Sequence, residues 1–190
     1  MFAISLGDDG AELRPLEPWQ AEEFLTHMDR GREFIGQYIT LADVVTDLES
    51  SRAYLQSYAD KAAAETGRIY GIWTGGRLVG GVLFRTMDVE HGVAEAGCWL
   101  EPSAAGKGLV TRAARVIIGW AIEERGLHRI EWLASTENEA SIAVARRLGM
   151  RKDGVLRERY PYRGRRHDTE VWSLLAPEWR AGGRSDLRSP

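Results

Sequence analysis

The chain has a single cysteine, Cys98, among its 190 residues. One cysteine excludes an intrachain disulfide and a cysteine-rich metal site, and it suits a reducing compartment. No stretch approaches the roughly 18 apolar residues needed to span a membrane. The start, "MFAISLGDDGAEL", lacks the basic and then apolar pattern of a secretion signal. We therefore expect a cytoplasmic protein with no bound metal and no membrane contact.

Complete nucleotide-binding motifs are also absent, although "WLEPSAAGKGLVTRAARVIIGWAI" places two glycines around Lys107, before a helical pattern. A Walker loop needs Ser or Thr after Gly-Lys, where this chain has Gly108. A dinucleotide fingerprint needs a third glycine, where this chain has Thr111. Small residues before a helix still suit an anion, because the first amides are unpaired and the helix dipole is positive there. The alternative is a tight connection without a ligand.

Positive charge is scarce in the first third of the chain. Residues 1–66 carry five Arg or Lys against 13 Asp or Glu, whereas residues 67–190 carry 20 against 15. Solvated helix faces are one explanation of this asymmetry. The other is functional: the first third would face a cationic group and the remainder would hold an anionic one.

Helical periodicity comes first along the chain, and strand patterns follow it. The expected elements are a strand in "AELRPLEP", a helix over 19–31, one long helix over 40–66 with Thr40 as N-cap, a hairpin over 68–88, a strand over 92–100, a helix over 106–125, a strand over 129–135, a helix over 138–148 and two strands around a turn at 164. This order predicts an α/β fold, with a mixed and mostly antiparallel sheet of about six to seven strands and helices on both faces. We expect one domain over 1–179 and a disordered tail over 180–190.

Two segments in order carry a resemblance to a known family. "EAGCWLEPSAAGKGLVTRAARVII" and "NEASIAVARRLGMRKDGVLRERY" resemble the GNAT superfamily of acyl-CoA-dependent N-acyltransferases. Within it they are similar to the branch of ribosomal-protein-alanine acetyltransferases, the RimJ/RimL-like enzymes. The likeness covers about residues 12–179 and includes the "GGRLVGGVLF" hairpin and the closing "GRRHDTEVWSLL". It implies a single GNAT domain whose central sheet splays open around coenzyme A.

The resemblance also implies where acetyl-CoA binds. The loop before the helix would give its amides to the pyrophosphate, and the pantetheine arm would lie beside the strand before it. The implied cofactor residues are Trp99, Leu100, Ala104, Ala105, Gly106, Lys107, Gly108, Leu109, Val110, Thr111, Arg112, Asn138 and Ser141. The chain departs from the family pattern at Ser103, where Gln or Arg is common, at Arg112, where many relatives have Glu, and at Met150, where Phe is usual.

Acyl transfer to an amine needs a base for the amine, stabilisation of the carbonyl oxygen and a proton donor for the departing thiolate. Glu95, on the strand expected to face the cofactor, is our candidate base, because burial there would raise its pKa. Pairing with an arginine is its alternative role, and His91 is a weaker candidate. The resemblance makes Ser141 the proton donor and the backbone near 133–135 the polariser of the carbonyl; the alternative role of Ser141 is helix capping or a cofactor contact without proton transfer. By the same resemblance Asn138 orients the cofactor, and its structural alternative is an N-cap, which one residue can combine with that role.

Aromatic residues suggest where the acceptor binds. By resemblance, Trp19, Phe34 and Tyr38 lie where relatives form the acceptor pocket. The other tryptophans are expected to pack in the core, and Cys98 is expected to be an inert core thiol.

The sequence therefore predicts an N-acetyltransferase that moves an acetyl group from acetyl-CoA to a primary amine in a ternary complex. A protein N-terminus is the preferred acceptor, with possible ribosome association and a possible homodimer. A small-molecule or antibiotic amine, or succinyl-CoA as donor, is the alternative. Residues 146–166 hold nine Arg or Lys with two tyrosines between them, so an RNA-binding protein remains a different reading. The remaining alternative function is a CoA-binding module without catalytic activity.

Overall fold

A single mixed sheet organises the molecule. The structure is a computed structural model that describes residues 3–7 and 9–186. Its eight strands run in the order β1-β2-β3-β4-β5-β6-β8-β7, and all neighbours are antiparallel except β5 and β6. The strands are β1 Ile4–Ser5, β2 Ala11–Pro15, β3 Arg68–Thr74, β4 Arg77–Asp88, β5 Val93–Leu100, β6 Arg129–Ser135, β7 Arg151–Tyr162 and β8 Arg165–Leu175. The predicted α/β fold is confirmed, and the two-residue strand β1 brings the sheet to eight strands.

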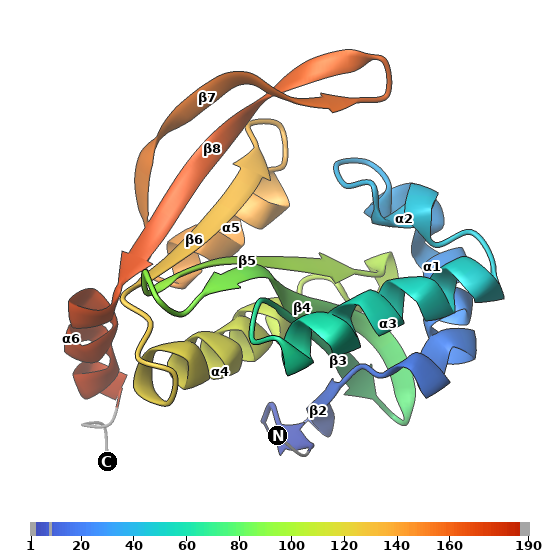
Figure 1. Ribbon diagram of the computed structural model, residues 1–190, viewed down its shortest axis with the longest axis horizontal. Coiled ribbons are helices and arrows are strands. Elements are labelled where there is room, and N and C mark those ends of the chain that lie inside the picture. The colour runs from blue at the N-terminus through green and yellow to red at the C-terminus, as the bar shows by residue number, and fades with distance from the viewer. Residues whose placement is uncertain (1–2, 8, 187–190) are drawn as a thin grey trace.

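Helices cover both faces of this sheet, as Figure 1 shows. They are α1 Ala21–Ile35, α2 Leu41–Val44, α3 Leu48–Ala63, α4 Leu109–Glu123, α5 Glu139–Arg147 and α6 Ala176–Asp186. The helices α1 to α3 bury their apolar side chains in one core, and α4 and α5 bury theirs in a second core on the other face. Side chains of β5 point alternately into the two cores: Ala94 and Ala96 belong to the second core and Trp99 to the first.

The parallel pair β5 and β6 separates along its length. Its pairing runs from Val93 with Arg129 to Ala96 with Trp132 and ends there. Beyond that point β5 still pairs with β4, and β6 still pairs with β8. The two strands therefore leave a gap in the middle of the sheet, and backbone groups on its edges have no strand partner. This gap is the splay that the resemblance predicts.

The helical region near the N-terminus is interrupted, so the prediction of one long helix over 40–66 is wrong, although Thr40 is the N-cap of its first part, without a side-chain capping bond. The helix α2 ends at Val44, and Asp47 starts α3 as its N-cap, with its side chain accepting from the backbone N–H of Ser50 at 2.8 Å. In return the backbone N–H of Asp47 donates to the Ser50 hydroxyl oxygen at 3.0 Å. This reciprocal cap stabilises a new helix start, which the continuous apolar periodicity of the sequence masks.

The strands β7 and β8 extend beyond the rest of the sheet. Pairing between β6 and β8 ends at Ser135 with Thr169, whereas β7 and β8 remain paired to Tyr162 with Arg165. Residues 157–167, called the arm below, are therefore a two-stranded hairpin, and no third strand from the described part of the chain pairs with it. In Figure 1 the arm projects from the top of the sheet toward α2.

The C-terminal helix α6 continues into the segment for which the sequence predicts a disordered tail. It begins at Ala176 and extends to Asp186, while residues 187–190 lie outside the described residues. The Glu178 carboxylate accepts from the backbone N–H of Leu175 at 3.0 Å, and Trp179 packs against Gly119 of α4. These two contacts fix the start of the helix, and past the expected end of the domain Arg180 forms an ion pair with Glu123 of α4.

Candidate active site

The gap between β5 and β6 opens into a cavity of about 1470 Å³. Three groups of residues line it. The side formed by α4 and α5 contributes Ala105, Gly106, Gly108, Leu109, Val110, Thr111, Arg112, Arg115, Asn138, Ser141 and Arg147. The strands at the gap contribute Arg85, Glu95, Cys98, Trp99, Leu100 and Trp132. The side formed by α1, α2, α3 and the arm contributes Phe34, Ile35, Tyr38, Leu41, Val44, Tyr54, Arg159 and Tyr160. The volume exceeds that of an ordinary drug-sized pocket, so an extended ligand fits together with a second molecule.

The loop before α4 forms a cradle of exposed backbone. Gly106 and Gly108 have φ angles of 77° and 70°, a left-handed conformation that favours glycine. Nothing lies within 4 Å of the position that a Cβ would take at either residue, so a ligand can approach the main chain directly. No acidic residue lies in the first turn of α4. Its unpaired N–H groups and positive dipole end therefore face the cavity as an anion site.

Arginine side chains surround this cradle. Arg112 lines the cavity and forms an ion pair with Asp9, whose pKa is held below its usual range by the hydrogen bond from Arg112. Lys107 is exposed and lies outside the cavity wall. Arg115 and Arg147 line the wall instead. Sequence reasoning missed both, although Arg115 follows Arg112 at the helical spacing of three residues that places two side chains on one face.

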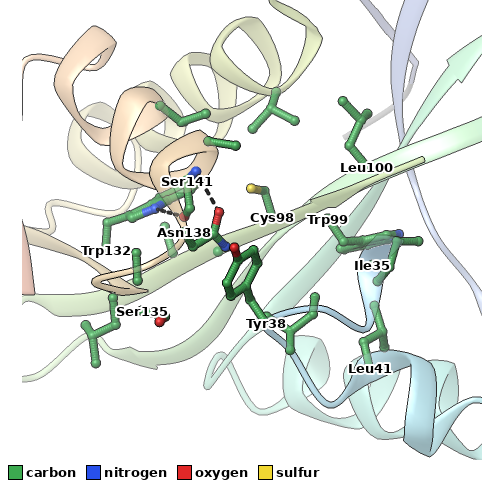
Figure 2. A pocket seen from close by; sticks show the side chains of 18 of the residues that line it. Ile35, Tyr38, Leu41, Cys98, Trp99, Leu100, Trp132, Ser135, Asn138 and Ser141 are labelled. Carbon is green, nitrogen blue, oxygen red and sulfur yellow. Dashed lines mark hydrogen bonds between the residues drawn. The ribbon is translucent and has the colours of Figure 1, made fainter. Parts of the chain in front are cut away.

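The other expected cofactor residues divide between wall and support. Trp99, Leu100, Ala105, Leu109, Val110 and Thr111 line the cavity. Ala104 is buried, and its backbone N–H donates to the Glu101 carbonyl, so it supports the loop from behind. Figure 2 shows Cys98 and Leu100 on one side of β5 and Trp99 on the other.

Ser141 and Asn138 meet at the start of α5, as Figure 2 shows. The Asn138 side chain accepts from the Ser141 backbone N–H at 3.1 Å, so Asn138 is an N-cap as expected. The Trp132 indole N–H donates to the Ser141 hydroxyl oxygen at 2.9 Å. Because that oxygen already accepts a hydrogen bond, the hydroxyl proton is oriented away from the indole and can donate to a group in the cavity.

Glu95 reaches the cavity from β5, with 22% of its side chain exposed. The Arg85 side chain on β4 donates from Nε to Glu95 Oε1 at 2.8 Å. The expected pairing with an arginine is therefore present, and it does not remove Glu95 from the wall. Oε2 has no hydrogen-bond partner among the residues that the structure describes. His91 is an exposed turn residue paired with Asp88, away from the cavity wall.

The single cysteine lies on the cavity wall without being activated. Burial raises the pKa of the Cys98 thiol to about 12, so it is a neutral thiol at pH 7. The expectation of an inert thiol agrees with this environment.

Two of the three expected acceptor residues lie in the cavity. Phe34, at the end of α1, and Tyr38, in the loop after it, both line the cavity. Figure 2 shows Tyr38 on the same side of the cavity as Leu41. Trp19 precedes α1 in a short 3₁₀ turn and is 79% exposed. Since the 15 residues of α1 separate Trp19 from the cavity end of the helix, Trp19 lies about 20 Å from it. Trp19 is therefore not part of this wall.

The charge asymmetry of the sequence has a different cause from the expected one. Among the described residues before 67, none that lines the cavity is acidic. Their lining is largely apolar and aromatic, and the carboxylates of the wall come from Glu95, Glu137 and Glu139. The expectation that acidic N-terminal helices face the acceptor amine is wrong, because none of their described carboxylates lines the cavity.

A buried polar network beneath the cradle escaped the sequence analysis. Glu101, 2% exposed, accepts hydrogen bonds from Arg30, Arg77 and Ser103. Its Oε2 lies 3.3 Å from Nδ1 of the fully buried His27.

The Trp99 indole N–H donates to His27 Nε2 at 3.0 Å. Burial lowers the pKa of His27 to about 4, although Glu101 opposes that shift. His27 is therefore neutral, with its remaining proton on Nδ1 facing Glu101. The network joins α1 to the end of β5 and to the loop that follows it.

Within residues 3–7 and 9–186, no cluster of three or more His, Cys, Asp or Glu could hold a metal ion. Over the same residues no helix is both long and apolar enough to cross a membrane.

The splayed α/β sheet, the backbone cradle at the start of α4 and the long cavity define an enzyme that holds a phosphorylated carrier beside a second substrate. A family model described as an acetyltransferase (GNAT) domain matches residues 11–151. The chain belongs to this family, and it is an acyl-CoA-dependent N-acetyltransferase.

Individual relatives agree with that assignment. The chain is 31% identical over 172 residues to the putative ribosomal N-acetyltransferase YdaF of Bacillus subtilis (strain 168), covering 88% of this chain and 92% of YdaF. A solved probable acetyltransferase is 29% identical with a TM-score of 0.86, over 94% of this chain and 99% of that one. The ribosomal L7/L12 α-N-protein acetyltransferase RimL in complex with coenzyme A shares the fold, with a TM-score of 0.87 at 19% identity, over 93% of this chain and 99% of that one.

Proposed function

We propose that the acceptor of this N-acetyltransferase is the α-amine of a polypeptide N-terminus, and that the donor is acetyl-CoA. The observation that carries the proposal is the shape of the cavity. Its lining extends from the cradle at α4, past Glu95, to Leu41 and Val44 of α2 and to Arg159 and Tyr160 of the arm. An extended chain that enters between α2 and the arm places its first residue inside the cavity and the rest outside. YdaF and RimL, named as ribosomal or ribosomal-protein acetyltransferases, support this choice.

The donor half binds through the main chain. The amides at the start of α4 hold the phosphates, and Arg112, Arg115 and Arg147 add positive charge around them. The edge of β5 over Gly97–Leu100, which has no pairing with β6, offers backbone groups to the pantetheine of acetyl-CoA. When bound, acetyl-CoA supplies an acetyl thioester, and the gap directs it toward the end of β6.

The acceptor half removes a proton from the amine. Glu95 Oε2 accepts it, directly or through one water, because Arg85 occupies only Oε1. The amine nitrogen then forms its bond to the acetyl carbon as the carbon–sulfur bond breaks. Backbone N–H groups near 133–135 stabilise the carbonyl oxygen. The Ser141 hydroxyl gives its proton to the departing sulfur and regains one, through water, from the acceptor nitrogen as the amide forms, so no alkoxide remains.

The experiment is a mass-spectrometric screen of peptides with free or blocked N-termini, each also carrying an internal lysine. We expect transfer to the free α-amine only. Acetylation of lysine, or of small amines and aminoglycosides in preference to peptides, would contradict a polypeptide N-terminus as acceptor. Succinyl-CoA in place of acetyl-CoA tests the acyl group, and faster transfer from it would contradict acetyl-CoA as donor.

Ser141→Ala tests the proton donor. We expect turnover to fall by about tenfold to a hundredfold, with the affinity for acetyl-CoA nearly unchanged. The Trp132 indole loses its acceptor in this variant, so Trp132→Phe is the matched control for any loss of stability. Equal losses of turnover in both variants would assign Ser141 a structural role.

The wider biology follows from the acceptor. A ribosomal-protein N-terminus would bring the enzyme to the ribosome and place the reaction in the cytoplasm. A homodimer is a further part of the proposal, and sedimentation analysis tests it.

A further inference from the structure

The arm, residues 157–167, carries more positive charge than the cofactor requires. It holds five arginines and one glutamate. Arg165 pairs with Glu137. Among the described residues, no carboxylate pairs with the remaining four, which are Arg157, Arg159, Arg163 and Arg166. The positive charge of the arm is therefore largely uncompensated.

The arm also borders the acceptor end of the cavity. Tyr162, at its tip, donates from its hydroxyl to the Gly36 carbonyl at 2.6 Å, and the Ile39 carbonyl lies 3.2 Å from the same oxygen. These bonds tie the arm to the loop between α1 and α2. Arg159 and Tyr160 line the cavity itself. The positive charge of the arm therefore reaches the part of the cavity wall where the proposed acceptor enters.

We propose that the arm is a docking surface for an acidic segment of the acceptor polypeptide, located a few residues after the acetylated amine. This inference rests on the proposed function. Acidic side chains pair with the uncompensated arginines while the amine lies at Glu95. The arm thus selects among N-termini by the charge of the residues that follow the first one or two.

An acidic polypeptide fits the arm better than RNA does. Single-stranded nucleic acid needs exposed aromatic faces for its bases. Tyr162 is buried, stacks on Tyr160 at 5.8 Å between ring centroids and uses its hydroxyl for the loop after α1. The chain as a whole carries a net charge of −3, which opposes a long polyanion but not a short acidic segment held at one site.

Three peptides that differ only at their third to sixth residues test the proposal. These positions carry Glu, Gln or Lys, and kcat/KM for α-amine acetylation is measured at low and high salt. We expect the order Glu, Gln, Lys, with about a fivefold preference for Glu over Gln from several weak pairs. Added salt should shrink that preference, because it screens exposed charges.

The variant Arg157→Gln/Arg166→Gln changes two arginines outside the cavity wall. We expect the Glu-over-Gln preference to fall toward one. Arg52→Gln/Arg180→Gln is the matched control: it removes the same charge from α3 and α6, and the preference should persist.

Two results separate the inference from the function beneath it. Equal acetylation of all three peptides overturns the docking surface alone. Binding of acetyl-CoA with no acetylation of any peptide overturns the polypeptide acceptor and the docking surface together. An unchanged peptide preference in the double variant, with loss of binding to a labelled RNA, assigns the arm to nucleic acid instead.

Discussion

The two halves of the cavity are built in different ways. The donor half comes from a nearly continuous stretch, from β5 through the cradle and α4 to the start of α5, and it presents mainly backbone groups. The acceptor half brings together the loop after α1, the strands β4 and β5, and the arm, and it presents mainly side chains. The donor site is therefore a property of local chain geometry, whereas acceptor choice depends on contacts between distant segments.

Glu95→Gln should give the largest effect and separate the halves most clearly. The amide cannot accept a proton from the amine, so we expect turnover at pH 7 to fall by about a hundredfold. The affinity for acetyl-CoA should change little, because Glu95 does not contribute to the cradle. Steady-state kinetics and calorimetry measure the two quantities. A loss of affinity equal to the loss of turnover would show that the halves are not separable.

His27 belongs to the buried network that joins α1 to the end of β5, so its titration changes the free energy of unfolding. Its pKa is about 4 in the folded protein and about 6.5 in the unfolded chain. The unfolded chain therefore binds more protons between these values, and stability falls as the pH is lowered from 6.5 to 4. For a fully buried group the loss is about 3 kcal/mol.

The variant His27→Gln removes this titration and keeps a side chain that can both donate and accept. Denaturant unfolding at several pH values should show a shallower loss of stability below pH 6.5 than in the unmodified protein. Identical pH profiles would mean that His27 is not the buried neutral group described above.

Gly108→Val tests the donor half alone. Valine at a φ of 70° is strained by about 1–2 kcal/mol, and its side chain blocks the approach of a phosphate to the cradle. We expect acetyl-CoA to bind about tenfold or more weakly by calorimetry. Gly126→Val is the matched control, since Gly126 also has a φ of 70° but lies outside the cavity wall. A similar loss of affinity in both variants would point to general destabilisation.

The features that the sequence could predict and those that it could not divide in the same way, between the donor half and the acceptor half of the cavity. The cradle, β5, β6 and the N-cap Asn138 are local patterns: "GKG" and "NEAS" mark the loop and the cap, the family resemblance assigns the loop to the cofactor, and alternating residues over 92–100 and 129–135 predict the strands. The ion pair of Glu95 with Arg85 and the bond from Tyr162 to Gly36 join segments ten and 126 residues apart. No periodicity encodes such a pairing. The Glu101 network joins α1, β4 and β5, and it was missed for the same reason.

Phe34→Ala and Trp19→Ala give the smallest effects and test the acceptor half. Phe34 lines the cavity, so its loss should raise the KM for the acceptor by about threefold to tenfold. Trp19 is exposed and lies at the opposite end of α1, so its loss should change neither KM nor the affinity for acetyl-CoA. An equal rise in KM for both variants would show that the acceptor reaches beyond the cavity.

The most direct measurement is hydrogen–deuterium exchange of the protein with and without acetyl-CoA. Bound acetyl-CoA should slow exchange in peptides that cover the end of β5, the cradle and the start of α5, residues 97–112 and 133–141. The loop after α1 and the arm should keep their exchange rates. Protection confined to that loop and the arm, or no protection at all, would contradict a donor site in the gap between β5 and β6.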